Sequence, residues 1–211
     1  EIPPSAEKKK KRTRFAGAPG APGVGLGQAF VISPAADLSG VVDKPAESIE
    51  DEIERFETAL EAARREIRIL GKKLSSELNP EEMALFDVYL NMLDDQALGA
   101  EVRARIVDGN WADGALRQVV MQYVGHFQMM EDVYLRERAS DIIDLGTRIL
   151  AHLQGHDEVP EYEFPADTIL VSEELTPAML GEVPAEKLRG LISVKGSSNS
   201  HVAILARAMG I

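Results

Sequence analysis

The sequence has 211 residues, 45% of them hydrophobic, which is enough for one large domain or two small ones. Its formal net charge of −12 argues against nucleic acid as a main partner, because phosphate backbones require a basic surface. The chain lacks cysteine, which excludes disulfides and thiolate chemistry, and no apolar run approaches the roughly 20 residues that span a bilayer. It begins at Glu1 without a signal peptide, and we interpret it as a fragment of something longer.

The first segment, residues 1–14, is predicted to be a linker from an upstream domain. It is polar, contains adjacent prolines and carries a basic run from Lys8 to Arg14. A basic run can mark a nucleic-acid or localisation patch. On an acidic chain and beside two prolines, a solvated linker is favoured.

Glycine and proline punctuate residues 15–33, which excludes a helix there. Within this segment, Gln28-Ala-Phe-Val-Ile32 is typical of a strand. The spacing Gly23-x-Gly25-x-Gly27 also occurs in nucleotide-binding loops, but here no strand precedes it and no helix follows it. We therefore predict tight turns at these glycines.

The middle of the sequence, residues 47–154, is predicted to form an antiparallel helical bundle. Ser48-Ile-Glu-Asp51 fits a capping box, and apolar residues then recur in steps of four and three as far as Leu74. Asn79-Pro80-Glu81-Glu82 is a second helix start, and that helix is predicted to end near Asp94. The remaining helices are expected over about residues 97–107 and, as a pair joined near 131–132, over residues 111–154.

Strands return after Gly155, which fits a helix C-cap. Residues 168–172 and 191–194 are typical of strands, a short helix is expected from Pro177 to Leu180, and a turn is expected from Lys187 to Gly190. Strands thus lie on both sides of the helical region. The simplest topology is an α/β domain built from residues 15–46 and 155–211, with the bundle inserted between them, so the predicted fold class is α+β or α/β.

The last sixteen residues combine a loop of small side chains with an apolar helix and one histidine at their junction. The loop consists of Gly196, Ser197, Ser198, Asn199 and Ser200. Either Asn199 or Ser200 can cap the helix, which places His201 in its first turn. Free N–H groups and the helix dipole favour an anion there, and the dipole disfavours imidazolium, which leaves a ring nitrogen as nucleophile.

This junction predicts a histidine that carries a phosphoryl group, and the alternative is a capping or packing histidine. The other three histidines, His126, His152 and His156, lack a comparable context. The first two fall in predicted helices among apolar residues, and the third follows a glycine in a polar loop. We expect packing or surface roles for them.

The segment Gly196-Ser-Ser-Asn-Ser-His-Val-Ala-Ile-Leu-Ala-Arg207 resembles the phosphohistidine segment of the enzymes that use phosphoenolpyruvate (PEP). These are enzyme I of the sugar phosphotransferase system, its nitrogen-type paralogue, PEP synthase and pyruvate phosphate dikinase. Ser197 and Val202 depart modestly from the usual pattern. Residues 132–150 and 168–177 are similar to further enzyme I segments, and the inserted bundle favours enzyme I over the dikinases.

By this resemblance the chain is the amino-terminal half of a cytoplasmic PEP–protein phosphotransferase. It contains the swivelling phosphohistidine domain of that family. The family continues with further strands after the position of Ile211, so we expect this domain to be truncated at its carboxy-terminal end. His201 would take phosphate from PEP, bound with Mg²⁺ in a separate carboxy-terminal domain of the same parent chain. It would pass the phosphate to a histidine of a small HPr- or NPr-like carrier. No metal, nucleic acid or membrane site is expected within this chain. The basic linker suggests the nitrogen-type paralogue, which has an upstream GAF sensor.

Two alternatives stay open: the swivelling domain of a PEP synthase or dikinase-like enzyme, and a non-catalytic docking module. Arg207 matches the family's arginine, and either phosphate contact or an ion pair that anchors the helix would explain it. Thr176 matches the family's Leu-Thr-Pro turn, where a turn or helix-cap role is expected. The resemblance places carrier binding on the bundle, at Ala84, Asp87, Tyr89, Met92, Leu98, Leu135 and Arg138.

Overall fold

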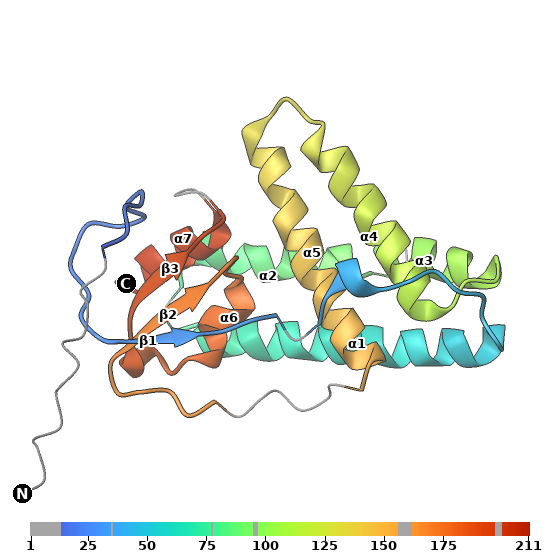
Figure 1. Ribbon diagram of the computed structural model, residues 1–211, viewed down its shortest axis with the longest axis horizontal. Helices are drawn as coiled ribbons and strands as arrows, with labels where there is room; N and C mark the ends of the chain where they lie inside the picture. Colours follow the sequence, from blue (N-terminus) through green and yellow to red (C-terminus); the bar gives the residue numbers. More distant parts are fainter. Residues whose placement is uncertain (1–13, 35, 77, 95–96, 156–161, 197–199) are drawn as a thin grey trace, which may run out of the picture.

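The structure, a computed structural model, describes residues 14–34, 36–76, 78–94, 97–155, 162–196 and 200–211, without the side chains of Val133, Tyr134, Glu137 and Ala178 (Figure 1). The predicted linker lies outside the described residues except for Arg14. So do Ser197, Ser198 and Asn199 of the loop before His201, and His156.

Five helices form the larger part of the molecule: α1 (Ile49–Leu74), α2 (Pro80–Met92), α3 (Leu98–Val107), α4 (Ala112–Gln128) and α5 (Val133–Leu153). Figure 1 shows α2 and α3 running back along α1, while α4 and α5 form an antiparallel pair that crosses it. Each helix predicted between residues 47 and 154 is present, with bounds within a few residues of those expected. The bundle thus consists of two layers that cross, one formed by α1 with α2 and α3 and the other by α4 and α5. The long helix α1 contacts the helices of both layers.

The apolar stripe of α1 forms the centre of the helical core. Phe56, Leu60, Ala63 and Ile67 are buried, and they pack with buried side chains of the other helices. Burying a large apolar side chain contributes about 1.5–3 kcal/mol, so this stripe is a main source of the stability of the bundle. No described helix is both long enough and apolar enough to cross a membrane.

The helix starts follow the local capping signals. Ser48 Oγ accepts a hydrogen bond from the Asp51 amide at 3.2 Å, which is one of the two bonds of the predicted capping box. The complete reciprocal capping box lies at the second helix, where Asn79 Oδ1 accepts from the Glu82 amide at 3.0 Å and the Glu82 carboxylate accepts from the Asn79 amide at 2.8 Å. These bonds satisfy amides that the first turn of a helix leaves without partners.

Three parallel strands, β1 (Gln28–Val31), β2 (Thr168–Ser172) and β3 (Leu188–Ser193), form a sheet with β2 in the middle. The entire helical region therefore lies in the connection between two neighbouring strands. The predicted turn from Lys187 to Gly190 is wrong, because β3 begins at Leu188. Leu188 is buried and pairs with Thr168, so tertiary packing extends the strand towards its beginning, and the turn falls earlier, at Ala185–Lys187.

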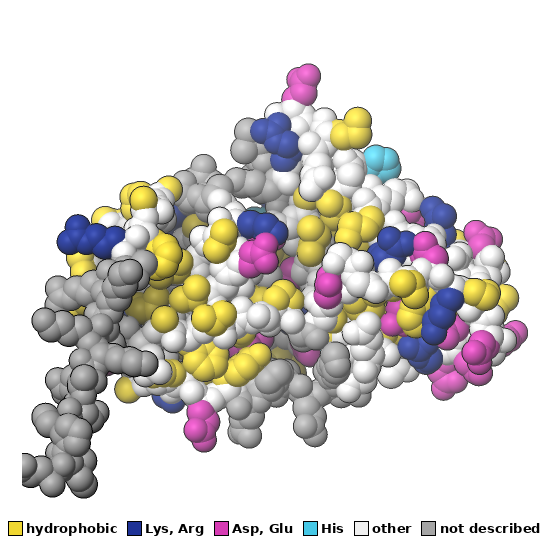
Figure 2. Space-filling model, viewed as in Figure 1, with side chains coloured by type: hydrophobic (Ala, Val, Ile, Leu, Met, Phe, Trp, Pro, Cys, Tyr) yellow, Lys and Arg dark blue, Asp and Glu magenta, His cyan; other side chains and the backbone are white. Residues whose placement is uncertain are grey.

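The sheet is covered unevenly. Helices α6 (Pro177–Glu182) and α7 (His201–Ala208) pack with the buried Leu170 through Leu180 and Leu205. On neighbouring positions of the strands, Val31 and Ile192 are exposed, and hydrophobic side chains gather over the sheet in Figure 2. Charged side chains instead gather at the opposite end of the molecule, towards the start of α1.

Two of the glycines before β1 lie so close to neighbouring backbone that a side chain would not fit. A Cβ atom at Gly27 would lie 2.6 Å from the Asp167 carbonyl oxygen, and one at Gly25 would overlap the carbonyl oxygen of Arg189. Of the three spaced glycines, Gly23 has the positive φ, at 142°. This φ is one that tight turns require, so a turn at Gly23 stays a prediction, and at Gly25 and Gly27 the absence of a side chain lets the segment approach β2 and β3.

Candidate functional site

The predicted junction between loop and helix is present at the carboxy-terminal end of β3. Gly196 has a φ of 110°, a left-handed conformation that glycine adopts without strain. Ser200 caps α7, and its Oγ accepts a hydrogen bond from the Ala203 amide at 3.3 Å. His201 is the first residue of α7, so the prediction that it lies in the first helical turn is confirmed.

The imidazole of His201 points towards the helical bundle. Its side chain is 19% exposed, and Nδ1 lies 3.1 Å from Oδ1 of Asp141 on α5. The site therefore lies where α7 of the sheet region meets the bundle. One edge of the ring contacts the protein, while part of the side chain remains accessible to a second reactant.

Asp141 is the centre of a buried hydrogen-bond cluster. The Tyr89 hydroxyl donates to its Oδ1 at 2.7 Å, and the Arg138 guanidinium lies 3.2 Å from its Oδ2. Burial raises the pKa of the Tyr89 phenol, and the nearby carboxylates of Asp141 and Asp144 raise it further, so the hydroxyl keeps its proton and donates. Asp141 was not among the residues predicted from the sequence.

Two of the predicted carrier-binding residues are corrected by their burial. Tyr89 is 1% exposed and belongs to the histidine site, because its hydroxyl has a buried partner there. Leu98 is 4% exposed and belongs to the helical core. Of the remaining positions, Ala84, Asp87 and Leu135 are exposed, and Met92 and Arg138 are partly buried.

Thr176 has the predicted capping role. Its Oγ1 accepts from the Met179 amide at 3.4 Å and so caps α6. The side chain also hydrogen-bonds Asp144. Burial raises the pKa of Asp144, while the Arg148 guanidinium and the Thr176 hydroxyl act in the opposite direction.

A charged cluster continues from Asp144 to the neighbouring helices. Arg148 lies 3.5 Å from Asp144 and 3.0 Å from Glu66 of α1. His152 Nε2 lies 2.9 Å from Glu66, which gives this histidine a packing role with a polar partner, in line with its predicted context. His126 is exposed on α4, so neither residue belongs to the site of His201.

Arg207 anchors α7 through a hydrogen bond. Its guanidinium donates to the Gly20 carbonyl oxygen at 3.0 Å, which joins the helix to the segment that precedes β1. Of the two roles considered, this contact supports anchoring of the helix. Direct contact with a phosphoryl group stays a prediction.

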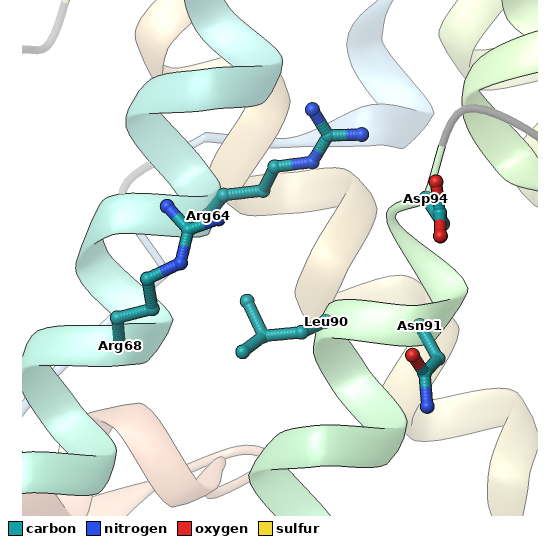
Figure 3. A pocket seen from close by; sticks show the side chains of 5 residues that line it. All are labelled: Arg64, Arg68, Leu90, Asn91 and Asp94. Carbon is teal, nitrogen blue, oxygen red and sulfur yellow. The ribbon is translucent and has the colours of Figure 1, made fainter.

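A separate hollow of about 330 Å³ lies between α1 and α2, lined by Arg64, Arg68, Leu90, Asn91 and Asp94 (Figure 3). Its arginines already have partners. Arg64 donates to the Leu93 carbonyl at the end of α2 from Nε at 3.1 Å, and Arg68 lies 2.9 Å from Glu61. The hollow contains no residue of the His201 site, and Arg64 joins α1 to the end of α2 while Arg68 pairs within α1.

Residues 16–138 match the family model described as PEP-utilising enzyme, N-terminal. Residues 164–211 match the model described as PEP-utilising enzyme, mobile domain. The chain belongs to the PEP-utilising enzymes. The second match contains His201 and α7, and the first contains Tyr89 and Arg138, so the two meet at this site.

Relatives within the PEP-utilising enzymes are phosphotransferase proteins. A protein of Escherichia coli (strain K12) named "Phosphoenolpyruvate-dependent phosphotransferase system" is 34% identical over 201 residues, 95% of this chain and 27% of the relative. A "Phosphoenolpyruvate-protein phosphotransferase" of Staphylococcus epidermidis is 31% identical over 191 residues, 90% of this chain and 33% of the relative. The chain thus spans about a third or less of the length of these two curated relatives.

Solved structures of enzyme I confirm the fold class. The "N-terminal domain of Enzyme 1 - Nitrogen" has a TM-score of 0.63 and 33% identity, and the match covers 92% of this chain and 79% of that chain. A solution structure titled as Enzyme I has a TM-score of 0.68 and 28% identity, with 91% and 78% covered. The resemblance to enzyme I predicted from the sequence is therefore confirmed.

Proposed function

We propose that this chain is the phosphoryl relay of a PEP-dependent phosphotransferase. His201 accepts phosphate from PEP held by a carboxy-terminal domain of the parent protein and passes it to a histidine of a small HPr- or NPr-like carrier. The observation that carries this proposal is the position of His201, which is partly exposed and is the first residue of a capped helix. Membership in the PEP-utilising enzymes supports it.

The first turn of α7 suits a phosphorylated side chain. Helix amides without partners and the positive end of the dipole stabilise an anion at this end. Phosphoryl transfer depends mainly on positioning and on stabilising charge, so a nucleophile at a helix start needs little additional chemistry. Backbone amides near Ser200 to Val202 are the groups that we assign to the phosphoryl oxygens.

The family implies a magnesium ion, and the described part of the chain offers no cluster of side chains to bind it. No group of three or more His, Cys, Asp or Glu side chains among these residues could hold a metal ion. We therefore assign no step on this chain to Mg²⁺.

We further propose that the chain is divided into two domains with different roles. Residues 15–46 and 155–211 form the phosphohistidine domain, and residues 47–154 form the carrier-binding bundle. The pairing of β1 with β2 across the helical region supports this division. After Tyr89 and Leu98 are assigned to the interior, five predicted carrier contacts remain: the exposed Ala84, Asp87 and Leu135, and the partly buried Met92 and Arg138.

The proposal is tested by phosphate transfer in the reverse direction. The 211-residue chain is incubated with an HPr-type carrier that carries ³²P on its histidine, and the chain is then assayed for an acid-labile, base-stable label. We expect label on the unmodified chain and on His126→Ala, which removes an exposed histidine of α4. We expect none on His201→Ala. An unlabelled unmodified chain, or equal label on His201→Ala, would contradict the proposal.

A further inference from the structure

Helix α6 is attached to the bundle at both of its ends. In its last turn, the Gly181 carbonyl oxygen accepts a hydrogen bond from Lys73 of α1. The same turn approaches α1 so closely that a Cβ atom at Gly181 would overlap the Leu70 side chain. At the other end, the Thr176 cap hydrogen-bonds Asp144 of α5. The position of α6 on the bundle therefore depends on polar contacts with two of its helices.

Charged side chains surround this contact, and the carboxylates outnumber the permanent cations. Three carboxylates meet there, one from each helix: Glu66 of α1, Asp144 of α5 and Glu182 of α6. Among the described residues, the permanent cations that face them are Arg148, 3.0 Å from Glu66 and 3.5 Å from Asp144, and Lys73. Such a surplus of negative charge is costly in a largely buried place, because little water is present to screen it.

Glu182 is the carboxylate on the α6 side of the contact. Burial raises the pKa of this carboxyl above its ordinary value, and Asp144 and Glu66 raise it further. The two cations act in the opposite direction without reversing the shift. Glu182 is therefore more easily protonated while α6 lies on the bundle than when water surrounds the side chain.

Two further groups complete the surroundings of this carboxylate. The Tyr162 phenol, which precedes β2, has its pKa raised by burial and by Glu182, so it stays neutral. His152 Nε2 lies 2.9 Å from Glu66, and the imidazole carries a charge only when it is protonated. Burial acts to raise the pKa of Glu66, but His152 and Arg148 together lower it, so Glu66 remains ionised above its ordinary range. Protonation of Glu182 or of His152 thus removes the surplus of negative charge.

We propose that the contact of α6 with α1 and α5 is a proton-sensitive latch, tight when Glu182 is protonated and weaker when it is ionised. Residues 164–211, which contain α6 and α7, match a family model described as a mobile domain. Because α7 packs on α6, the latch also influences how firmly the segment that carries His201 is held on the bundle. Any effect on phosphate transfer rests on the proposed function, whereas the latch itself does not.

The direction of the pH dependence follows from the two states of Glu182. Its pKa is raised while α6 is docked and returns to the ordinary value once α6 is detached and the carboxyl is hydrated. Docking is therefore strongest below the ordinary pKa and weakens as the pH rises through the raised one. Burial also raises the pKa of Asp144, which contributes in the same direction.

The test measures the distance between the sheet region and the bundle at several pH values. The chain lacks cysteine, so Ala104→Cys on α3 and Val194→Cys after β3 provide two labelling sites, both at exposed positions. Single-molecule energy transfer between pH-insensitive dyes then counts docked and undocked molecules of the 211-residue chain. Circular dichroism verifies that the helix content is unchanged. We expect the ratio of docked to undocked molecules to fall several-fold between pH 5 and pH 8.

Glu182→Gln removes the titration and keeps the shape of the side chain. We expect this variant to stay docked at both pH values, and Glu186→Gln, at an exposed position nearby, to follow the unmodified chain. A single docked population of the unmodified chain at both pH values would overturn the inference. So would a pH response of Glu182→Gln equal to that of the unmodified chain.

Lys73→Met tests the contribution of the cation at the end of α6. The variant loses both the bond to the Gly181 carbonyl and a positive charge that favours ionised Glu182, so we expect more undocked molecules at pH 8 than in the unmodified chain. Lys72→Met, at an exposed neighbouring position of α1, is the control and should change nothing. Equal undocked fractions in the two variants would contradict the latch. Since these measurements use no phosphate donor, they are independent of whether His201 becomes labelled.

Discussion

Arg148 of α5 and Glu66 of α1 form an ion pair of 3.0 Å beside the histidine site. Asp144 lies at 3.5 Å on the other side of the guanidinium, and the Thr176 cap of α6 hydrogen-bonds Asp144. The positive charge of Arg148 therefore offsets, in part, the negative charges of two carboxylates, Glu66 and Asp144, where the bundle meets α6. This cluster fixes α5, and with it Asp141, relative to the sheet region.

Replacing this arginine is expected to destabilise the protein strongly. Arg148→Met leaves the carboxylates of Asp144 and Glu66 in a largely buried place without their cation, which costs about 3 kcal/mol in the free energy of unfolding. Urea unfolding at pH 7 measures this change. The matched control is Arg189→Met, which breaks an exposed ion pair of 2.8 Å with Asp167 and is expected to cost about 1 kcal/mol or less. Equal losses would show that the cluster is not compensated as described.

The stability of the protein is expected to respond to pH through Glu182. Burial raises its pKa above the ordinary value, with Asp144 and Glu66 acting in the same direction and Arg148 in the opposite one. The folded state therefore holds the proton more tightly than the unfolded chain, so this contribution to stability is complete below the ordinary pKa and is lost as the pH rises through the raised one.

Glu182→Gln removes that titration. Between pH 4 and pH 8 we expect the variant to gain stability relative to the unmodified protein, as measured by urea unfolding at several pH values. Glu186→Gln, which changes an exposed glutamate nearby, is the control and should follow the unmodified protein. Parallel curves for Glu182→Gln and the unmodified protein would contradict the assignment.

At Gly27, just before β1, a side chain is expected to destabilise the sheet. Gly27→Ala places a Cβ atom 2.6 Å from the Asp167 carbonyl oxygen, which accepts the Gln28 amide at 2.8 Å. Since the obstacle is backbone, β1 must shift from β2, at a cost of about 1–3 kcal/mol. Gly17→Ala is the control, because no atom lies within 4 Å of its added Cβ. Unfolding in urea, together with hydrogen exchange of the β1 amides, distinguishes the two variants.

The cap of α7 is expected to matter for stability and for transfer. Ser200→Ala removes the acceptor of the Ala203 amide, and loss of such a cap costs about 1 kcal/mol. Ser48→Ala removes the equivalent cap of α1 and serves as the control. Both variants should lose similar stability in thermal unfolding, but only Ser200→Ala should lower the rate at which His201 is labelled by the phosphorylated carrier. Equal labelling rates would contradict a role for the helix start.

The helices and the histidine junction could be predicted because their signals are local. Asn79 followed by Pro80, Glu81 and Glu82 is a local helix-start signal, and the stripe from Phe56 to Leu74 requires only that apolar side chains cover it. His201 is recognisable because a small-residue loop and a helix follow one another in the sequence. None of these features depends on knowing which segments meet.

One signal for Asp141 was present in the sequence. Arg138, Asp141, Asp144 and Arg148 recur at spacings of three and four, which places four charged residues on one face of α5. A charged face of this kind is also common on exposed helices, so the spacing could not say that this one is buried against Tyr89 and His201.

The sequence by itself predicted the order and approximate bounds of the helices, the family, and His201 as the candidate nucleophile, because each prediction follows from residues that are neighbours in the chain. Only the tertiary structure decided the environment of His201. Asp141 is 60 residues from His201 and 52 from Tyr89, and their hydrogen bonds exist only once α2, α5 and α7 are packed. Tyr89 was predicted to lie on the surface and is buried for the same reason. Which face of a helix becomes buried depends on the elements that pack against it.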